Sequence, residues 1–264
     1  MRRWTDPSAP FELVLSPPAP ETPNMNLLRY GKAGLAGTTL GLSLISAASD
    51  VLLEERFHES ELSQSWWVEG GQSVTIEEGR LRVRADPAER HAPGYVCTVW
   101  NETPIKGDVK IDFDAHVLSS SIKANNINAF FSYADPAGTP LRDSRTQRIT
   151  ADYSLYHKLD GYIFTFLNAG QNDADDTRAR IRLRRCPGFE LLKETFDYHC
   201  QPGQTYHITI TRRGDNLSMA IDGQVFIRAT DPSPHLSGIF GLRTYHTDLW
   251  WDNLMITQLD PTTP

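Results

Sequence analysis

Apolar and polar side chains alternate through most of the chain after residue 50, and this pattern predicts short β-strands. In the segment 109–117 the odd-numbered side chains are apolar and the even-numbered ones are charged or polar. A strand of this kind has one face in a core and the other in solvent. Helical periodicity is almost absent, so we predict an all-β protein.

Segments of this type recur along the chain, separated by Asp-Gly, Gly-Asp, Asp-Pro and Pro-Gly turn signals. About twelve to fourteen strands fit the length, and their number and spacing are typical of a sandwich or barrel. We predict two curved antiparallel sheets in a jelly-roll sandwich. The predicted strands are 51–57, the hairpin 73–85 that turns at Glu78-Gly79, 94–100, 109–117, 127–133, 152–159, 161–168, 177–185, 205–213, 216–229, 237–245 and 249–257.

Two of these segments are apolar on both faces. In 161–168, Tyr162, Phe164 and Phe166 point one way, while Ile163 and Leu167 point the other. The neighbouring segment 126–133 also carries aromatic residues on both faces. One interpretation is a sheet with the core behind it and a sheltered, sugar-binding groove in front, where sugars stack on aromatic rings. The alternative is a sheet that other parts of the chain cover.

The first fifty residues differ from the rest and predict export. Residues 1–24 are rich in proline without a regular period, which indicates a disordered or misassigned start. Residues 25–49 have the layout of a secretory signal peptide: a basic start, an apolar run at 33–45 and a small-residue cleavage region. A membrane anchor is the alternative, but the run is short for a span. We expect a secreted, extracellular protein with one domain over residues 50–260 and no membrane contact after cleavage.

Sequons and cysteines bear on the same expectation. Asn101 and Asn216 begin glycosylation sequons, which suggest a glycoprotein. Cys186 and Cys200 flank a short loop that a disulfide would close in an oxidising compartment. Cys97 lies in an apolar run and is expected to be a buried free thiol.

The arginines of the segment 177–185 stand out against the charge of the whole chain. The formal net charge is −7, which argues against general nucleic-acid binding. Yet four arginines, at 178, 180, 182 and 184, alternate with apolar residues and share one strand face. Spaced by roughly 6.5–7 Å, their guanidinium groups suit the carboxylates of a uronate-containing glycan. The alternative is a row of inter-strand salt bridges to aspartates; the candidates are Asp112, Asp114 and the loop residues Asp173, Asp175 and Asp176.

Longer motifs resemble a known family. The runs YHKLDGYIFTFLN and RLRRCPGFELL, together with NNINAFFSYADP, GYVCTVWN and GLRTYHTDLWWDNL, resemble the YesU-like family of concanavalin A-like jelly rolls. The resemblance covers about residues 51–258. It implies the concanavalin A-like fold and a role in the breakdown of polysaccharides, often those with uronic acids. The family's Arg-Lys pair before the Pro-Gly-Phe turn stands here as Arg184-Arg185-Cys186.

A uronate substrate favours β-elimination, so we predict a polysaccharide lyase. This reaction needs a cation at the carboxylate, a base for the C5 proton and an acid for the leaving oxygen. We assign catalysis to Arg184, with His157 or Tyr156 moving the proton. Strand geometry favours pairing of His157 with Tyr153, or of Tyr156 with Tyr162. Tyr245 and His246 are a second candidate pair, and the alternative role of His157 is structural. The residues expected to bind substrate are Arg180, Arg182, Asn128, Trp100, Phe130, Tyr162, Phe164, Tyr245 and His246.

Two other functions stay open: a glycan-binding module without catalysis, and a glycoside hydrolase. Hydrolysis requires two carboxyl groups beside the bond. Glu69 and Glu102 are isolated candidates, and Asp112 and Asp114 share one strand face. We expect no metal site and no cofactor; the acidic residues at 172–176 suit calcium, although a solvated turn is the preferred interpretation.

Overall fold

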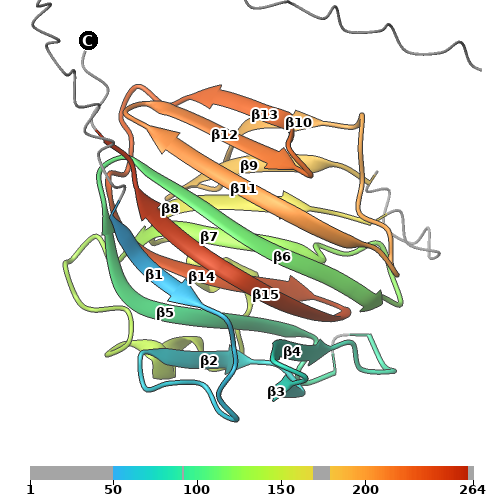
Figure 1. The fold of residues 1–264 in the computed structure, drawn as a ribbon. Coiled ribbons are helices and arrows are strands. Elements are labelled where there is room, and N and C mark those ends of the chain that lie inside the picture. The colour runs from blue at the N-terminus through green and yellow to red at the C-terminus, as the bar shows by residue number, and fades with distance from the viewer. Residues whose placement is uncertain (1–49, 91, 169–178, 261–264) are drawn as a thin grey trace, which may run out of the picture. The chain divides into compact units, whose positions relative to one another are not determined.

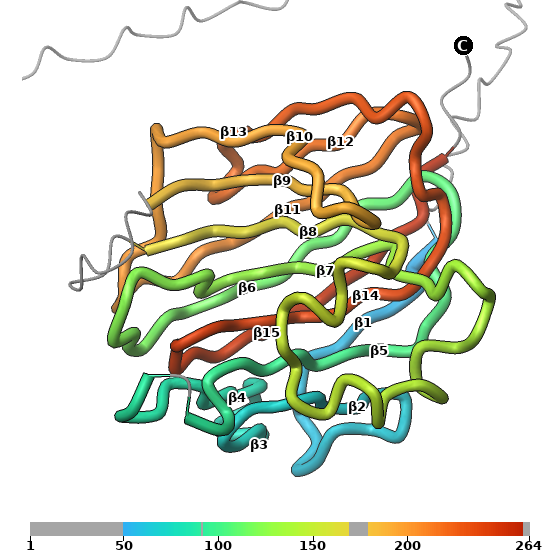
Figure 2. The backbone as a smooth tube through the Cα atoms, turned by 180° about the vertical axis from the view of Figure 1, so that it is seen from behind, coloured from blue at the N-terminus to red at the C-terminus, as the bar shows by residue number. Residues whose placement is uncertain are grey.

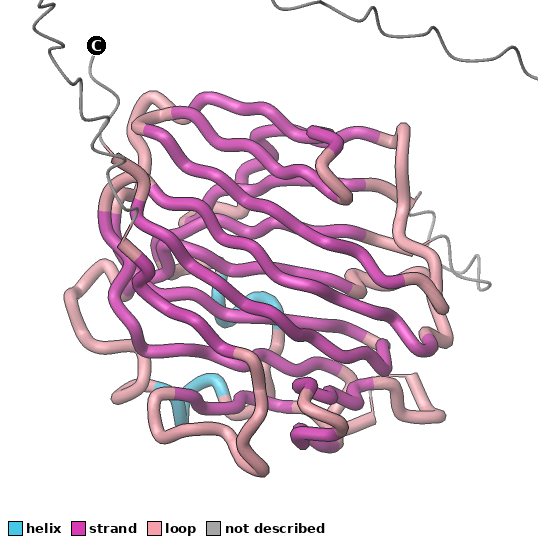
Figure 3. Tube along the Cα trace, viewed as in Figure 1, coloured by secondary structure: helices cyan, strands magenta, loops and turns pink. Residues whose placement is uncertain are grey.

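The computed structural model describes residues 50–90, 92–168 and 179–260, and these residues form two stacked antiparallel sheets (Figures 1 and 3). Sheet A has eight strands in the order β13-β12-β11-β6-β15-β4-β3, with β1 also paired to β15. Its strands are β1 (Val51–Glu55), β3 (Ser73–Glu77), β4 (Arg80–Ala85), β6 (Val109–Ser119), β11 (Thr205–Arg213), β12 (Asn216–Ile221), β13 (Gln224–Thr230) and β15 (Thr247–Gln258). The predicted jelly-roll sandwich is confirmed.

Sheet B has seven strands in the order β10-β9-β8-β7-β14-β5-β2. They are β2 (Trp66–Gly70), β5 (Val96–Lys106), β7 (Ile127–Ala134), β8 (Asp160–Phe166), β9 (Ile181–Cys186), β10 (Glu190–Thr195) and β14 (Ser237–Tyr245). Strands β2 and β10 fall in segments where no strand is predicted. The hairpin of β3 and β4 turns at Glu78 and Gly79 as predicted, with both residues at positive φ, which a two-residue hairpin turn requires.

The core lies between the sheets and is built by the predicted alternation. On β6, Val109, Ile111 and Phe113 point inward, and on β8, Tyr162 and Phe164 do the same. Antiparallel pairing of β6 with β11 places Ile111 opposite Ile210, so the apolar faces of both strands meet the same core. Sheet B has a second apolar layer on its outer face, which distinguishes it from sheet A.

The segment 152–159, expected as a strand, has a different structure. It contains the 3-10 helix η2 (Tyr153–Tyr156), and η1 (Arg145–Arg148) precedes it in the long connection between β7 and β8. Tyr156 and Leu159 are buried because the segment packs across the outer face of sheet B, not because they join the sheet (Figure 2). The prediction of a strand here is wrong, and the alternative of a covered sheet holds for this region.

The expected disulfide is also wrong, since Cys97, Cys186 and Cys200 are all free and buried. Cys186 pairs with Gly161 at the start of β8, whereas Cys200 bridges to Asn168 just beyond its end. The length of a strand, about 20 Å, therefore separates the two thiols, far beyond bonding reach.

The first sequon is inaccessible in the folded protein. Asn101 is buried, and its side-chain oxygen accepts a hydrogen bond from the backbone N–H of Thr103 at 2.9 Å. Asn216 is exposed. None of the helices in the described residues is long and apolar enough to cross a membrane.

Candidate functional site

The connection between β7 and β8 forms a roof over part of sheet B and thereby creates the candidate site. Proline at 136 and 140 and glycine at 138 interrupt extended structure after β7. The chain then returns over β7, β14 and β5, as Figure 2 shows. Leu141, Tyr156 and Leu159 point down onto the sheet and are buried against Trp100 and Phe130.

The roof is fixed by one buried carboxylate, that of Glu69 on β2. Its Oε1 accepts from Trp67 Nε1 at 3.2 Å and lies 3.1 Å from Arg148 Nη2. Its Oε2 accepts from Trp100 Nε1 at 3.1 Å and from the Tyr156 hydroxyl at 2.7 Å. Every lone pair of this carboxylate is directed at a donor, so Glu69 is structural and cannot serve as a hydrolytic acid.

The catalytic prediction for Tyr156 is wrong for the same reason. Its side chain is fully buried, and its hydroxyl donates to Glu69. Burial raises the pKa of this hydroxyl strongly, even though the nearby Arg243 opposes that shift. Tyr156 therefore holds the roof in place and does not reach a ligand.

Arg243 on β14 lies beneath the roof. It is 2% exposed, and Nη1 donates to Thr98 Oγ1 and to the carbonyl of Ala151, both at 2.8 Å. Its guanidinium also lies 4.9 Å from the ring centroid of Tyr153. Arg243 forms no ion pair with any residue that the structure describes, although buried charges are normally paired.

A second buried arginine, Arg212, shows how such a charge is satisfied by neutral groups alone. Its guanidinium donates to the carbonyls of Gly107, His235 and Leu236 and to the hydroxyl of Ser132. These partners surround it completely, whereas the hydrogen bonds of Arg243 all come from one nitrogen. The two arginines therefore differ in role: Arg212 ties loops together, and Arg243 borders open space.

That open space is a hollow of about 210 Å³ at the edge of the roof. Its walls combine three tyrosines with an amide and the Arg243 guanidinium; the lining residues are Tyr95, Val96, Asn125, Tyr153, Arg243 and Tyr245. Tyr95 donates to Asp152 at 2.8 Å, and burial followed by this bond raises the pKa of Tyr95 to about 12. Tyr95 also lines a larger neighbouring hollow of about 820 Å³ beside Val68 and Ile149.

The arginine row of β9 lies on the same face of sheet B. Arg182 Nη2 donates to Asn125 Oδ1 at 3.1 Å, which brings it to the lining of the hollow. Arg184 donates to the Phe189 carbonyl at 2.9 Å and lies 4.1 Å from the Phe189 ring centroid. Arg180 pairs with Glu194 at 2.7 Å. Of these three arginines only Arg180 forms an ion pair among the described residues, so neither Asp112 nor Asp114 neutralises the row; Arg178 lies outside the described residues.

Unpartnered polar atoms concentrate here. Among the described residues, eight buried side-chain polar atoms make no hydrogen bond of normal geometry. Four of them belong to Tyr153, His157, Arg182 and Arg184, which are neighbours on this face. Buried polar groups are usually satisfied, so this cluster of exceptions distinguishes the outer face of sheet B from the rest of the described residues.

The aromatic rings arrange His157 and Tyr153. The His157 ring stacks on Phe189 at 3.9 Å between centroids, and Tyr153 meets the His157 ring edge-on at 4.9 Å. Burial, and then the charges of Arg243 and Arg184, lower the pKa of His157. Burial raises the pKa of Tyr153, against the opposing effect of Arg182 and Arg243. Near neutral pH the imidazole is therefore neutral and the phenol is protonated.

Other predicted site residues have different positions. Tyr162 and Phe164 lie in the core between the sheets, so the prediction that they line a groove is wrong. Trp100 and Phe130 lie on sheet B beneath the roof and are fully buried, so they do not offer an open surface to a sugar. Tyr245 lines the hollow, while His246 is 1% exposed and its Nδ1 lies 3.3 Å from Asp86.

Asn128 is buried and does not line the hollow itself, but it contacts a residue that does. It accepts from Thr165 Oγ1 at 2.8 Å, and its Nδ2 donates to the carbonyl of Asn125 at 2.8 Å. Asn125 in turn holds Arg182. Asn128 thus positions the residue that joins the arginine row to the hollow.

The carboxylates considered for hydrolysis are dispersed. Glu102 pairs with Arg142 at 2.6 Å, and Asp112 and Asp114 lie on the outer face of sheet A beside His207. No group of three metal-ligating residues occurs within the described part of the chain. The acidic residues at 172–176, considered for calcium, lie outside the described residues.

Arg243, Tyr95 and Asn125 are part of the hollow, but the sequence did not single them out. The signal for Arg243 is a charged residue between Gly241 and Tyr245 on one face of an otherwise apolar strand. Its role depends on the roof above it, which no local pattern reveals.

A family model described as "Domain of unknown function (DUF6250)" matches residues 93–254, which include the roof, the arginine row and Arg243. The chain belongs to this family. No curated protein matches the sequence.

Solved structures similar to this DUF6250 member share its fold. A Bacillus subtilis protein of unknown function with a galectin-like fold has a TM-score of 0.67 at 16% identity, over 80% of this chain and 98% of the other. The carbohydrate binding module CBM66 from Bacillus subtilis has a TM-score of 0.51 at 14% identity, over 74% and 96%. The Emp47p carbohydrate recognition domain has a TM-score of 0.54 at 14% identity, over 78% and 94%. These similarities establish the lectin-like jelly roll.

Proposed function

We propose that this protein binds a glycan in the hollow beside the roof, and that the bound unit carries a carboxylate. The proposal rests on Arg243. Its guanidinium is buried, forms no ion pair among the described residues and lines the hollow. An anionic ligand there would gain a charge-assisted contact in a setting that is shielded from water.

The rest of the hollow suits a sugar. Tyr95, Tyr153 and Tyr245 present rings for the apolar face of a pyranose, and the Asn125 amide offers polar contacts. Arg182 and Arg184 extend the basic surface along β9, each with an unpartnered Nε. Similar folds in proteins named as a carbohydrate binding module and a carbohydrate recognition domain support this function by analogy of fold.

Isothermal titration with oligogalacturonate and with neutral cello-oligosaccharides tests the proposal. We expect saturable binding of oligogalacturonate, and loss of at least tenfold in affinity in an Arg182→Gln variant. Binding of the neutral sugar with equal affinity would refute the acidic specificity. Absence of binding to both would refute the glycan site.

A second candidate, cleavage by β-elimination, is favoured by the pairing of His157 with Tyr153. The neutral His157 imidazole would remove the C5 proton of a uronate, and the electron pair would form the C4–C5 double bond. The leaving O4 would take its proton from the Tyr153 hydroxyl, while Arg182 or Arg184 neutralises the carboxylate. Ultraviolet absorbance of the unsaturated product measures this activity, and binding without such absorbance would leave the protein a glycan-binding module.

We also propose that the chain is a distant relative of the YesU-like proteins and that it is secreted. The motifs Arg182–Leu192 and Asn125–Pro136 support the relationship, since both lie at the arginine row and hollow. Secretion rests on the signal-like residues 25–49, and the free cysteines add nothing to it. Expression from a start at Met25 with N-terminal sequencing of the exported protein tests the cleavage.

A further inference from the structure

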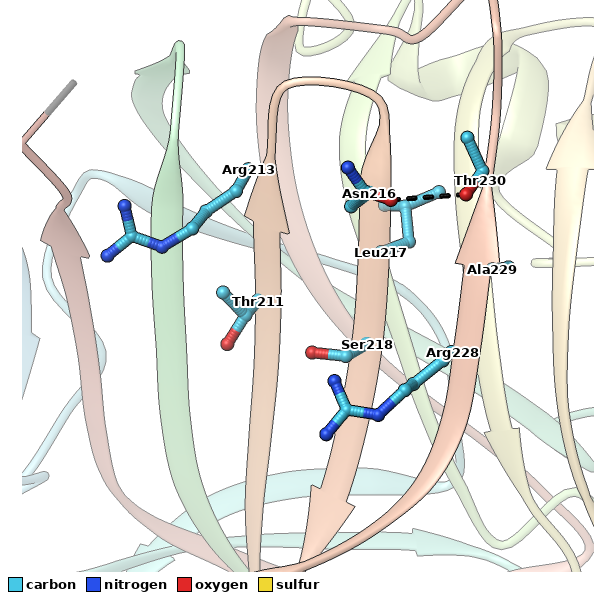
Figure 4. Close-up of a pocket in the computed structure, with 8 residues that line it drawn as sticks. All are labelled: Thr211, Arg213, Asn216, Leu217, Ser218, Arg228, Ala229 and Thr230. Carbon is cyan, nitrogen blue, oxygen red and sulfur yellow. Dashed lines mark hydrogen bonds between the residues drawn. The ribbon is translucent and has the colours of Figure 1, made fainter. Parts of the chain in front are cut away.

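The outer face of sheet A carries a groove of about 470 Å³ (Figure 4). The hollow lies on the outer face of sheet B, which is the opposite side of the sandwich. Three adjacent strands, β11, β12 and β13, form it. Its lining is dominated by hydroxyl, amide and guanidinium groups; the residues are Thr211, Arg213, Asn216, Leu217, Ser218, Arg228, Ala229 and Thr230.

Strand register arranges these side chains in two parallel rows. Thr211 pairs with Ser218, and Ser218 pairs with Arg228. Two residues along, Arg213 pairs with Asn216, and Asn216 pairs with Thr230. Neighbouring strands lie about 4.8 Å apart and the rows roughly 6.5–7 Å apart. Small hydroxyl side chains thus form a floor between two long basic ones.

The two guanidinium groups keep their charge available to a ligand. Arg228 is exposed, and its side chain makes no hydrogen bond or ion pair with any residue in the described part of the chain. Within residues 50–260, as far as they are described, Arg213 donates only to the backbone carbonyl of Asp260, at 3.3 Å. In Figure 4 Arg228 reaches across β12 toward Ser218, and Arg213 extends from β11 toward β6.

Nearby charges do not cancel this basic pair. No carboxylate is among the lining residues of the groove. Asp215 accepts from Asn216 Nδ2 and Asp108 from the Gly214 N–H, both at 2.6 Å, but neither carboxylate forms an ion pair with Arg213 or Arg228 among the described residues. The groove therefore combines two unneutralised guanidinium groups with regularly spaced hydroxyls, on a chain whose net charge is −7.

We propose that this groove is a second glycan-binding site, which takes a sugar bearing an oxyanion, either a carboxylate or a sulfate ester. Arginine forks bind such groups with paired hydrogen bonds. The hydroxyls of Thr211 and Ser218 and the neighbouring Asn216 amide match the hydroxyls of a sugar ring. This site is independent of the hollow under the roof.

Nuclear magnetic resonance titration tests the proposal with the full chain, by following the backbone amides of Thr211 and Ser218. The probes are oligogalacturonate for carboxylate and a sulfated galactan oligosaccharide for sulfate ester. We expect at least one of them to shift these amides saturably, and the one that does identifies the anion. The same titration in an Arg182→Gln background is expected to give unchanged affinity at the groove, which separates the two sites.

The double variant Arg213→Gln, Arg228→Gln is expected to weaken binding at the groove at least tenfold. A matched variant, Arg84→Gln with Lys106→Gln, removes the same charge from exposed positions elsewhere and is expected to change affinity less than about twofold. Equal weakening in both variants would refute a specific site. Absence of shifts with both sugars, equal binding of inorganic sulfate alone, or equal binding of a DNA duplex would also refute it.

Discussion

The carboxylate of Glu69 and the guanidinium of Arg148 form an ion pair of 3.1 Å in which both side chains are almost wholly buried. Glu69 belongs to β2 at one edge of sheet B, and Arg148 belongs to the roof. The pair therefore joins two segments that are distant in sequence and holds the surface on which Tyr153 and His157 are placed.

Removal of this carboxylate is expected to destabilise the fold. Glu69→Gln would leave Arg148 buried without its partner and weaken the bonds from Trp100 and Tyr156, so we expect a loss of about 3–5 kcal/mol in the free energy of unfolding. Urea denaturation measures this change. Glu102→Gln, which breaks an exposed pair with Arg142, is the matched control, with an expected change of less than about 1 kcal/mol. Equal effects of the two variants would show that the buried ion pair does not stabilise the fold more than an exposed one.

Substitution of Arg182 is expected to affect binding more than stability. Arg182→Gln removes a half-buried guanidinium whose Nη2 contacts Asn125, and we expect at least a tenfold weaker binding of oligogalacturonate. Arg182→Lys keeps the charge but loses the planar fork, and should recover only part of the affinity. Full recovery in the lysine variant would indicate that charge alone matters at this position.

Stability is expected to fall in mild acid because of His157 and His116. The pKa of each is lowered in the folded protein, mainly by burial, from an ordinary value of 6.5. Below about pH 6.5 the unfolded chain binds protons that the folded chain does not, so the free energy of unfolding decreases as the pH falls toward the folded pKa values. Urea midpoints between about pH 7.5 and about pH 5.5 measure this decrease. The double variant His157→Gln, His116→Gln should flatten the dependence, and an unchanged slope would contradict the assignment.

The three thiols are expected to be unreactive in the folded protein. Burial raises the pKa of Cys97 to about 12 and also raises the pKa values of Cys186 and Cys200. A thiol reagent should therefore label none of them until the chain unfolds, and then label all three. A melting temperature that drops on addition of a reducing agent would instead indicate a disulfide.

The regular alternation of β6 and β11 made these strands predictable from sequence, because each directs alternate side chains into one core. The failure at residues 152–159 has a physical cause. Tyr153 and Tyr156 look like strand residues, but they pack against the outside of a sheet in a segment that itself forms short 3-10 turns. Burial by a covering loop and burial within a sheet select the same residue types.

The site was predictable only in part. Arginines at every second position of β9 do share the face of the hollow, because strand geometry alone fixes that face. The roles of Arg243 and Glu69 depend on contacts between β14, β2 and the roof. Tyr156, for example, lies 87 residues from Glu69 along the chain, and local periodicity does not reveal a contact at that distance. A lone charged residue in an apolar strand was the available clue, and its partner had to come from the three-dimensional structure.

The hollow and the groove face away from each other across two sheets that stack about 10 Å apart. With a glycan at each surface, as proposed, one molecule would hold two polysaccharide segments at once and act as a cross-linker. A mixture with long acidic polymer would then scatter light at intermediate protein ratios and clear when protein is in excess.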